Sequence, residues 1–176
     1  KEEKGKKEEM TALQIAIDKG HTEIARLLLG RPNTDVNIKS IKRSKDETKE
    51  KTALIIAIKK KNSEITRILL GRPDTNVNIK YIKRSSDKQE EESPILIAAR
   101  KDNVEIVQLL LKRPEVDLNI KYTKISKDKE EQKTPLLVAV ENKNYLIARE
   151  ILSNPAVDVN SKLLKKSKDK TKEQTA

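Results

Sequence analysis

The chain repeats one pattern of residues every 41 positions, and this period limits its fold more than any other feature. The four copies read TALQIAIDKGHTEIARLLL, TALIIAIKKKNSEITRILL, SPILIAARKDNVEIVQLLL and TPLLVAVENKNYLIAREIL. Units of this size bury apolar surface by stacking on their neighbours, so we predict one linear array over residues 1–176. The units span residues 11–51, 52–92, 93–133 and 134–174; Thr175 and Ala176 begin a fifth, which predicts a fragment of a longer array.

Each unit has the pattern of two short helices. A Thr or Ser opens the first helix, where its hydroxyl can accept from a free backbone N–H, and Pro94 or Pro135 suits the first helical position. In the first unit, apolar residues gather at 13–17 and, after a break at Gly20, again at 24–29. An alanine recurs where two helices must approach closely, at Ala16, Ala57, Ala98 and Ala139.

Composition narrows the class of protein. A charged fraction of 38% and a mean hydropathy of −0.75 approach the values of disordered chains, but the repeated apolar positions supply a core. The sequence has no cysteine for a disulfide or a thiolate zinc site, which fits a reducing compartment. It has no apolar run near the roughly 18 residues of a membrane span, and KEEKGKKEEM at the start lacks an apolar signal-peptide core. We expect a cytoplasmic protein without a cofactor.

The fourth copy, TPLLVAVENKNYLIAREIL followed by DVN, resembles the ankyrin repeat, and all four copies keep the register. The resemblance implies an all-α repeat solenoid in which ankyrin-type helix pairs are joined by extended β-hairpins. It also implies a non-catalytic scaffold for protein–protein interaction, which binds through its hairpins and the inner face of the first helices.

Two departures from the ankyrin pattern concern single positions. The histidine of the family's opening motif is replaced by Gln14, Ile55, Leu96 and Leu137, which predicts the loss of a polar link between repeats. The family's glycine after the first helix survives only as Gly20. In the other units we expect Asn62, Asn103 and Asn144 to take the left-handed conformation, which asparagine tolerates best after glycine.

The third departure is the length of the connecting hairpin. An ordinary ankyrin unit has about 33 residues, and nearly all the added residues follow the Asn of Asp-Val-Asn. The outgoing limbs, residues 38–44, 79–85, 120–126 and 161–167, carry charges of +3, +3, +2 and +3. The turns and return limbs that follow them carry 0, −3, 0 and +1. We expect stacked hairpins to place a basic ladder beside a neutral or acidic one.

Two interpretations of the basic limbs remain open. In the first interpretation, the lysines serve only to protect a solvated sheet edge from aggregation, and the tyrosines pack across strands. Alternatively, the limbs bind an acidic protein partner. The candidate residues on the limbs are then Lys39, Lys42, Arg43, Lys80, Tyr81, Lys83, Arg84, Lys121, Tyr122 and Lys124.

The ankyrin resemblance adds residues at the inner ends of the first helices. By position these are Asp18, Lys19, Lys59, Lys60, Arg100, Lys101, Glu141 and Asn142. The second and third units contribute only basic residues to this set, namely Lys59, Lys60, Arg100 and Lys101, which favours an acidic partner.

Nucleic-acid binding through the lysine-rich hairpins is the alternative function, since the net charge is +11 and the pI about 9.6. Several features argue against it. Lysine outnumbers arginine, tyrosine is the only aromatic residue, and acidic residues interrupt the basic limbs.

The sequence offers little for catalysis. His21 is the only histidine and aligns with asparagines of the other units, so we interpret it as a turn residue, and we predict no metal site and no enzyme. Both ends of the array resemble interior units, with apolar Leu13, Ile15 and Ile17 in the first and Val138, Ile147 and Ile151 in the last. End-to-end self-association is therefore a further expectation.

Overall fold

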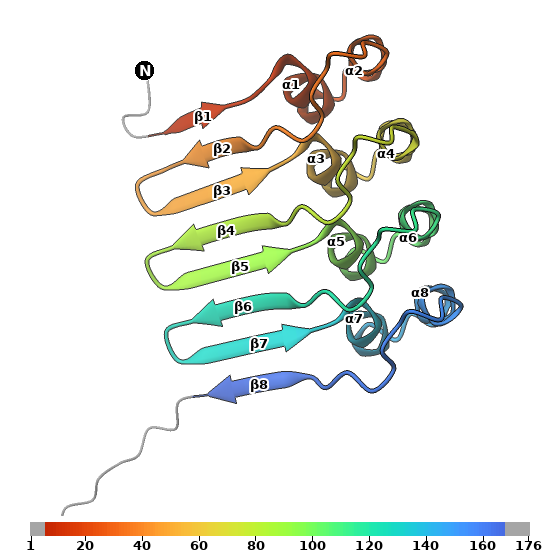
Figure 1. Cartoon of the computed structure of the whole chain (residues 1–176). Helices are drawn as coiled ribbons and strands as arrows, with labels where there is room; N and C mark the ends of the chain where they lie inside the picture. Colours follow the sequence, from red (N-terminus) through yellow and green to blue (C-terminus); the bar gives the residue numbers. More distant parts are fainter. Residues whose placement is uncertain (1–5, 168–176) are drawn as a thin grey trace, which may run out of the picture.

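The computed structural model describes residues 6–167, which fold into four stacked helix pairs and one sheet (Figure 1). Thr175 and Ala176, with the end of the predicted fourth unit, lie outside these residues. The helices are α1 (Ala12–Lys19), α2 (Thr22–Leu29), α3 (Ala53–Lys59), α4 (Ser63–Gly71), α5 (Pro94–Arg100), α6 (Val104–Leu111), α7 (Pro135–Glu141) and α8 (Tyr145–Leu152). One helix pair falls in each predicted unit, so the predicted helical solenoid is confirmed.

The hairpins are ordered strands and join into one antiparallel sheet with the order β1 to β8 (Figure 1). The strands are β1 (Lys7–Glu9), β2 (Ser40–Arg43), β3 (Glu47–Lys51), β4 (Tyr81–Ser85), β5 (Lys88–Glu92), β6 (Tyr122–Ser126), β7 (Lys129–Lys133) and β8 (Leu164–Ser167). Each hairpin also pairs with its neighbours, so a return limb separates every two outgoing limbs. The basic limbs therefore do not form a ladder of their own.

The first helix of each unit begins as the sequence predicts. Thr11, Thr52 and Thr134 accept a hydrogen bond from the backbone N–H three residues later, while Ser93 makes no such bond. Gln14 completes a capping box with Thr11 and also donates 2.6 Å to the carbonyl of Ile38, at the start of the outgoing limb. The glutamine thus keeps a polar link at the position where the family has histidine.

The turn between the two helices differs from the prediction. The left-handed residues are Gly20, with a φ of 77°, and then Lys61, Asp102 and Lys143, with φ between 53° and 57°. The asparagines that follow, Asn62, Asn103 and Asn144, cap the second helix by accepting a hydrogen bond from a backbone N–H. The prediction of left-handed asparagine is therefore wrong, because the side chain is needed as an N-cap.

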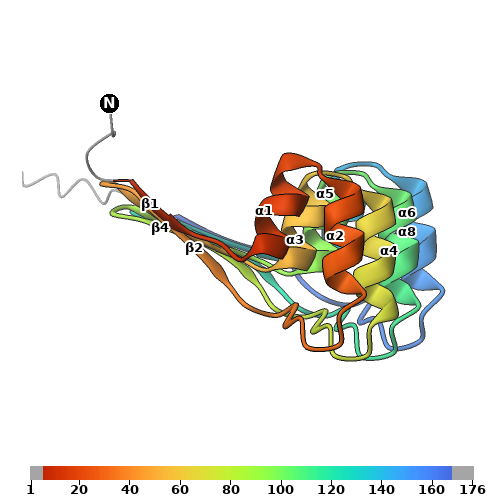
Figure 2. The ribbon, with the colours of Figure 1, turned by 90° about the horizontal axis from the view of Figure 1, so that it is seen from above.

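The core runs between two layers of helices. Helices α1, α3, α5 and α7 lie nearer the sheet and the other four lie behind them (Figure 2). The recurring alanines at positions 16, 57, 98 and 139 are all buried, which allows the helices to approach closely. The buried apolar side chains form a single cluster along the stack, so each unit completes the core of its neighbours.

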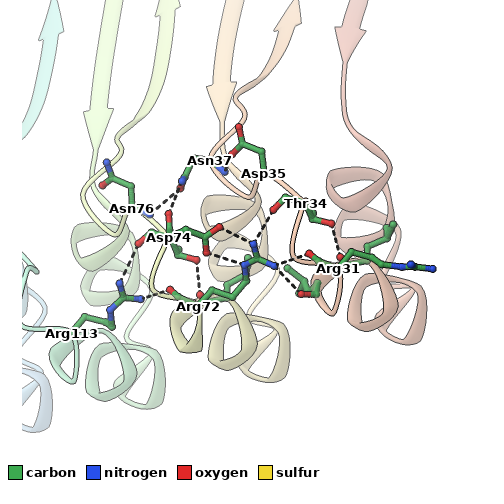
Figure 3. A network of polar contacts seen from close by, with 12 residues as sticks. Arg31, Thr34, Asp35, Asn37, Arg72, Asp74, Asn76 and Arg113 are labelled. Atoms are coloured by element: carbon green, nitrogen blue, oxygen red, sulfur yellow. Dashed lines mark hydrogen bonds and ion pairs between the residues drawn. The ribbon is translucent and has the colours of Figure 1, made fainter.

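An arginine links the second helix pair to the first, and another links the third to the second (Figure 3). Arg72 donates to the carbonyls of Leu29, Arg31 and Thr34 at 2.9, 3.1 and 3.0 Å, and it also bonds Asp74. Arg113 repeats the arrangement one unit further on, with the carbonyls of Leu70, Arg72 and Thr75. We call this arrangement the arginine clamp. It satisfies carbonyl groups at the end of the preceding second helix.

In the first three units, the asparagine that ends the Asp-Val-Asn segment, or its equivalent, forms a second link in the opposite direction. The Asn37 amide donates to the carbonyl of Asp74 at 2.7 Å, and its oxygen accepts from the N–H of Asn76 at 2.9 Å (Figure 3). The amides of Asn78 and Asn119 contact the following unit in the same way. In both links a side chain of one unit bonds backbone groups of the neighbouring unit. The links therefore fix how the units align with one another in the stack.

Candidate functional site

The predicted basic residues lie on two opposite faces of the sheet. Side chains alternate along a strand, whereas residues paired across strands share a face. The face that carries Lys42, Tyr81, Lys83, Tyr122 and Lys124 we call the inner face. The outer face carries Lys39, Arg43, Lys80, Arg84 and Lys121. A rigid partner on one face cannot reach the residues of the other, so the predicted set does not form one surface.

The inner face continues into the ends of the first helices. Lys59 at the end of α3 lies over the Tyr81 ring, with its amine 2.9 Å from the ring centroid. Arg100 at the end of α5 bonds Glu92 at 2.5 and 2.9 Å, and Glu141 at the end of α7 accepts from Lys133 at 2.5 Å. Figure 2 shows the sheet projecting from the helical layers at an angle. A hollow of about 170 Å³ lies where the inner face meets the ends of α5 and α7, and it is lined among others by Arg100, Tyr122 and Glu141.

One row of charged residues crosses the middle of the inner face. In strand order from β1 it contains Glu8, Lys42, Lys49, Lys83, Glu90, Lys124, Glu131 and Lys165. Acid and base alternate over the last five strands. On β2, β3 and β4, however, Lys42, Lys49 and Lys83 are direct neighbours, and we call them the lysine row. Like charges in facing positions repel, so this arrangement is costly for the sheet itself.

Carboxylates beside the lysine row reduce this repulsion only in part. Lys42 pairs with Glu8 at 2.8 Å, while Lys83, at 2.7 Å, and Lys49 share the single carboxylate of Glu47. Hydrogen bonds from Lys49 and Lys83 hold the pKa of Glu47 below its usual value. The hydrogen bond to Glu47 raises the pKa of Lys83. Glu8 and Glu90 face the two ends of the row and Glu47 lies beside it, but no carboxylate stands between the three lysines in the facing positions.

Next to this row, the second unit lacks an ion pair that the later units have. Glu92 pairs with Arg100 and Lys133 with Glu141, each linking the end of a return limb to the end of the next helix. One repeat earlier, the equivalent residues are Lys51, at the end of the first return limb, and Lys59, at the end of α3, which have the same charge. Lys51 makes only a 3.8 Å contact with Glu8, and no carboxylate within residues 6–167 lies at ion-pair distance from Lys59. Burial lowers the pKa of Lys59 to about 8.

The two predicted tyrosines form the floor of this surface. Tyr81 and Tyr122 are only 5% and 6% exposed, so they offer a partner little area. Burial raises the pKa of both phenols, that of Tyr81 to about 12. The Tyr122 hydroxyl donates to Glu90 at 3.4 Å. Both rings lie on the same face, in the outgoing strands β4 and β6, and β5 separates them. We therefore interpret the tyrosines as residues that stabilise the sheet, not as anchors for a partner.

The outer-face residues fall into two groups. Lys39 and Arg84 pair with Glu50, at 3.2 and 3.1 Å, and Lys80 pairs with Glu91 at 3.1 Å. Arg43 and Lys121 are exposed, and no ion pair joins either one to another described residue. This face therefore has its excess charge at separate points instead of in a row.

The family model described as "Ankyrin repeats (3 copies)" matches residues 1–81 and 79–162. This chain belongs to the ankyrin-repeat family. Among solved structures it is similar to the crystal structure of the ankyrin repeat protein EF0377, with 21% sequence identity and a TM-score of 0.65. That similarity covers 88% of this chain and 67% of the other, and it concerns the fold. A search of curated proteins found no match.

Ankyrin repeats are generally scaffolds for protein–protein interaction. In this ankyrin array, none of the helices within residues 6–167 is long and apolar enough to cross a membrane. Over the same residues, no cluster of His, Asp and Glu side chains has an arrangement that could hold a metal ion.

The remaining predicted residues lie at the helix ends of the ankyrin array. Lys60 pairs with Asp18 at 3.2 Å, Arg100 is held by Glu92, and Lys101 is partly buried. Sequence reasoning missed Lys49 and Lys51, because the charges of their turn and return limb sum to zero. The signal was present in the alignment, where the return limb TKEK has lysine at positions that are glutamate in QEEE.

A hollow of about 580 Å³ lies further along the sheet, lined among others by Lys124, Lys129, Glu131 and Lys165. In this hollow, however, each lysine of the central row faces a carboxylate. We place the candidate site at the lysine row and Lys59 instead, since unbalanced charge favours binding more than volume does.

Proposed function

We propose that this ankyrin array is a non-catalytic scaffold that binds an acidic segment of a partner protein on its inner face. The observation that carries the proposal is the lysine row, which lies across β2, β3 and β4 next to the unpaired amine of Lys59. An array selected only for stability gains nothing from like charges in facing positions. A partner that supplies carboxylates there is attracted by the lysines and removes the repulsion between them.

The position of Lys59 strengthens this attraction. Lys59 is partly desolvated over the Tyr81 ring, so its charge interacts more strongly than a charge on an open surface. The buried tyrosine rings keep the floor of the site rigid. Complementary charge of this kind increases the rate of association and selects among partners more than it adds to affinity.

The charge pattern of the row favours a protein over nucleic acid. Glu8, Glu90 and Glu131 lie in line with the lysines on the same face. A polyphosphate backbone along the row would meet a carboxylate at each of these strands, whereas a short acidic segment needs only the span of β2 to β4. Nucleic acid remains the alternative partner and is distinguished by the experiment below.

The experiment compares two double variants that each remove two positive charges from neighbouring sites. Lys49→Gln with Lys83→Gln removes two charges from the inner face of β3 and β4, and Lys80→Gln with Arg84→Gln removes two from the outer face at and just before β4. Each pair leaves carboxylates without a partner, Glu47 in the first case and Glu91 in the second. Wild type and both variants are used to capture proteins from lysate with and without nuclease treatment, and the captured proteins are quantified by mass spectrometry.

We expect the inner-face variant to lose proteins that the outer-face variant retains, with slower association measured for each purified partner at low salt. The difference should decrease as the salt concentration rises, since screening weakens the attraction in wild type. Equal capture by all three proteins would refute the inner face as the binding surface. Capture that disappears on nuclease treatment in all three would instead favour nucleic acid.

A further inference from the structure

The charges of the inner face recur at a spacing that the strands set. Lys42, Lys49 and Lys83 occupy facing positions on β2, β3 and β4. Neighbouring strands of a sheet lie about 4.8 Å apart, so the lysine row spans about 9.6 Å from its first residue to its last. A segment that pairs with all three lysines must therefore present three acidic groups, one for each step of about 4.8 Å.

The ammonium groups of the row stay close to this spacing. The side chains of Lys42, Lys49 and Lys83 are 42%, 32% and 37% exposed, so their stems lie against the sheet and do not extend freely into solvent. Glu8 binds the amine of Lys42, and Glu47 binds the amines of the other two lysines. The spacing of the charges thus follows the spacing of the strands.

An α-helix laid across the strands matches the row, whereas an extended segment does not. Acidic residues at i, i+4 and i+7 share one face of a helix, and at about 1.5 Å per residue they span about 10.5 Å. In an extended segment only alternate residues share a side, so three of them span about 13.5 Å. The helix therefore differs from the row by about 1 Å, and the extended segment differs from it by about 4 Å.

The residues next to the row define the rest of the charge pattern. Glu8 on β1 and Glu90 on β5 face the two outer lysines in the same line. A helix over these five strands therefore meets one charge per turn, in the order acid, base, base, base, acid. Its complementary stripe reads Lys, Glu, Glu, Glu, Lys at about i, i+4, i+7, i+11 and i+14. Lys59 lies over Tyr81, two residues from Lys83 on the same face, and offers a further cation to the flank of such a helix.

We propose that the acidic partner segment is an α-helix that lies across β1 to β5 with this stripe against the lysine row. The inference rests on the proposed function, and it adds the secondary structure of the partner segment and the positions of its charges. The three glutamates of the helix pair with Lys42, Lys49 and Lys83, and its two lysines pair with Glu8 and Glu90. The stripe thus supplies carboxylates to the three facing positions in which this chain has only lysines.

The outer face of the same strands offers no such match. There the facing positions on β2, β3 and β4 hold Ile41, Glu50 and Ile82 in one row and Arg43, Thr48 and Arg84 in the next. Neither row carries three like charges in succession across these strands. The charge pattern therefore directs the helix to the inner face, and the outer face provides the control surface.

Three synthetic peptides with the same charged residues test the inference on the whole chain. The first carries the stripe on an alanine-based helix that a cross-link on its opposite side holds in shape. The second has the same cross-link, but its charged residues are distributed around the helix. The third places the three glutamates at alternate positions and contains prolines that prevent a helix. Fluorescence anisotropy measures the binding of each peptide at low salt.

We expect the first peptide to bind wild type about tenfold more tightly than the other two, since only its charges meet all three lysines. Lys49→Gln with Lys83→Gln should remove this preference, whereas Lys80→Gln with Arg84→Gln should retain it. Three peptides that bind wild type equally, or no binding by any of them, would overturn the helix. The capture experiment tests the proposed function separately, and equal binding of all three peptides that the inner-face variant loses would support that function without the helix.

A charge exchange tests the alignment of the helix with the row. Lys49→Glu should weaken binding of the stripe peptide about tenfold, because the central glutamate of the peptide then faces a like charge. A peptide with lysine at this central position should bind the variant about tenfold more tightly than it binds wild type. Circular dichroism confirms that the variant is folded, and Lys49→Gln, which removes the charge without reversing it, should discriminate less between the two peptides. A Lys49→Glu variant that still prefers the original peptide would show that the helix does not lie along the row.

Discussion

At the scale of single residues, the turn between the two helices of a unit needs two things: a residue in the left-handed conformation and an N-cap for the second helix. Three of the four turns combine a left-handed residue with an asparagine that caps the next helix. The first unit has the better left-handed residue, Gly20, but follows it with His21, which makes no side-chain cap. The backbone of His21, with φ −79° and ψ 72°, nevertheless resembles that of Asn62, with φ −84° and ψ 88°.

His21→Asn should therefore stabilise the array. An asparagine at this position can accept from the N–H of Ile24, as Asn62 accepts from Ile65. We expect the free energy of unfolding in urea to rise by about 0.5–1 kcal/mol, the usual contribution of an N-cap. The reverse change, Asn62→His, is the control and should lower it by a similar amount. Equal stability of wild type and His21→Asn would contradict this interpretation of the turn.

Lys59 makes the stability depend on pH in a defined direction. Burial lowers its pKa to about 8 in the folded protein, against about 10.4 in the unfolded chain. The unfolded state therefore binds more protons between these values, so this lysine adds stability as the pH rises from about 8 to about 10.4. Below pH 8 the buried charge destabilises the protein in full.

Lys59→Met removes this effect and tests it. The variant should be more stable than wild type at pH 7, and its advantage should shrink as the pH approaches about 10.4. The measurement is urea denaturation of both proteins across this range, with the titration of the lysine followed by NMR. A difference in stability that is constant with pH would mean that Lys59 titrates normally.

At the scale of elements, the hairpins are fixed to the helices by the ends of their return limbs. Glu92 is the clearest case, because its carboxylate is buried at the end of β5 and receives two hydrogen bonds from Arg100. Its neighbour Glu91 points to the outer face and pairs with Lys80. The two residues have the same charge and adjacent positions, but only one of them connects sheet and helix.

Glu92→Ala should destabilise the array by about 2–3 kcal/mol, because it leaves the partly buried Arg100 without its acceptor. Glu91→Ala, at a surface ion pair, should cost less than about 1 kcal/mol. Urea denaturation followed by circular dichroism measures both values. A similar loss for the two variants would show that the buried pair does not anchor the hairpin.

The outgoing and return limbs were predictable from the sequence, but the arrangement of their charges was not. The limb of residues 79–85 was expected to be extended, and β4 spans Tyr81–Ser85. Summing charge over a limb, however, discards the alternation that sends Lys83 inward and Arg84 outward. It also hides the pairing between hairpins that makes Lys49 a neighbour of Lys83, since that register depends on how the units stack.

At the scale of the whole molecule, the links between units are not all equal. The arginine clamp joins the second unit to the first and the third to the second, but the fourth unit has Asn154 in place of arginine. Asn154 accepts instead from the N–H of Ala156 in its own loop. The junction of the last two units therefore lacks the clamp and depends on packing, on the Asn119 link and on side-chain contacts that Gln108 and Asp102 make with the fourth unit.

Asn154→Arg should repair this junction. The new side chain would reach the carbonyls of Leu111, Arg113 and Val116, and we expect about 1 kcal/mol of added stability. Asn154→Ala is the control for loss of the asparagine itself. Chemical denaturation of the three proteins gives the comparison, and an arginine variant no more stable than the alanine variant would refute the clamp as a source of stability.

The helical solenoid was predictable because every unit repeats the same apolar pattern. A helix that is hard to recognise in one copy can be recognised by comparison with the others. The clamp was not, because Arg31, Arg72 and Arg113 precede a proline and read as ordinary loop residues. Their role appears only when a neighbouring helix end presents its carbonyl groups.

The continuous sheet has a mechanical consequence. A stack of helix pairs changes its curvature when each unit rotates slightly on the next. Here every such rotation must also shear hydrogen-bonded strands along β1 to β8, because the hairpins are paired with each other as well as within themselves. Under a pulling force this array should therefore behave as a stiffer spring than a stack with separate hairpins, and it should hold the curvature of its inner face while a partner is bound.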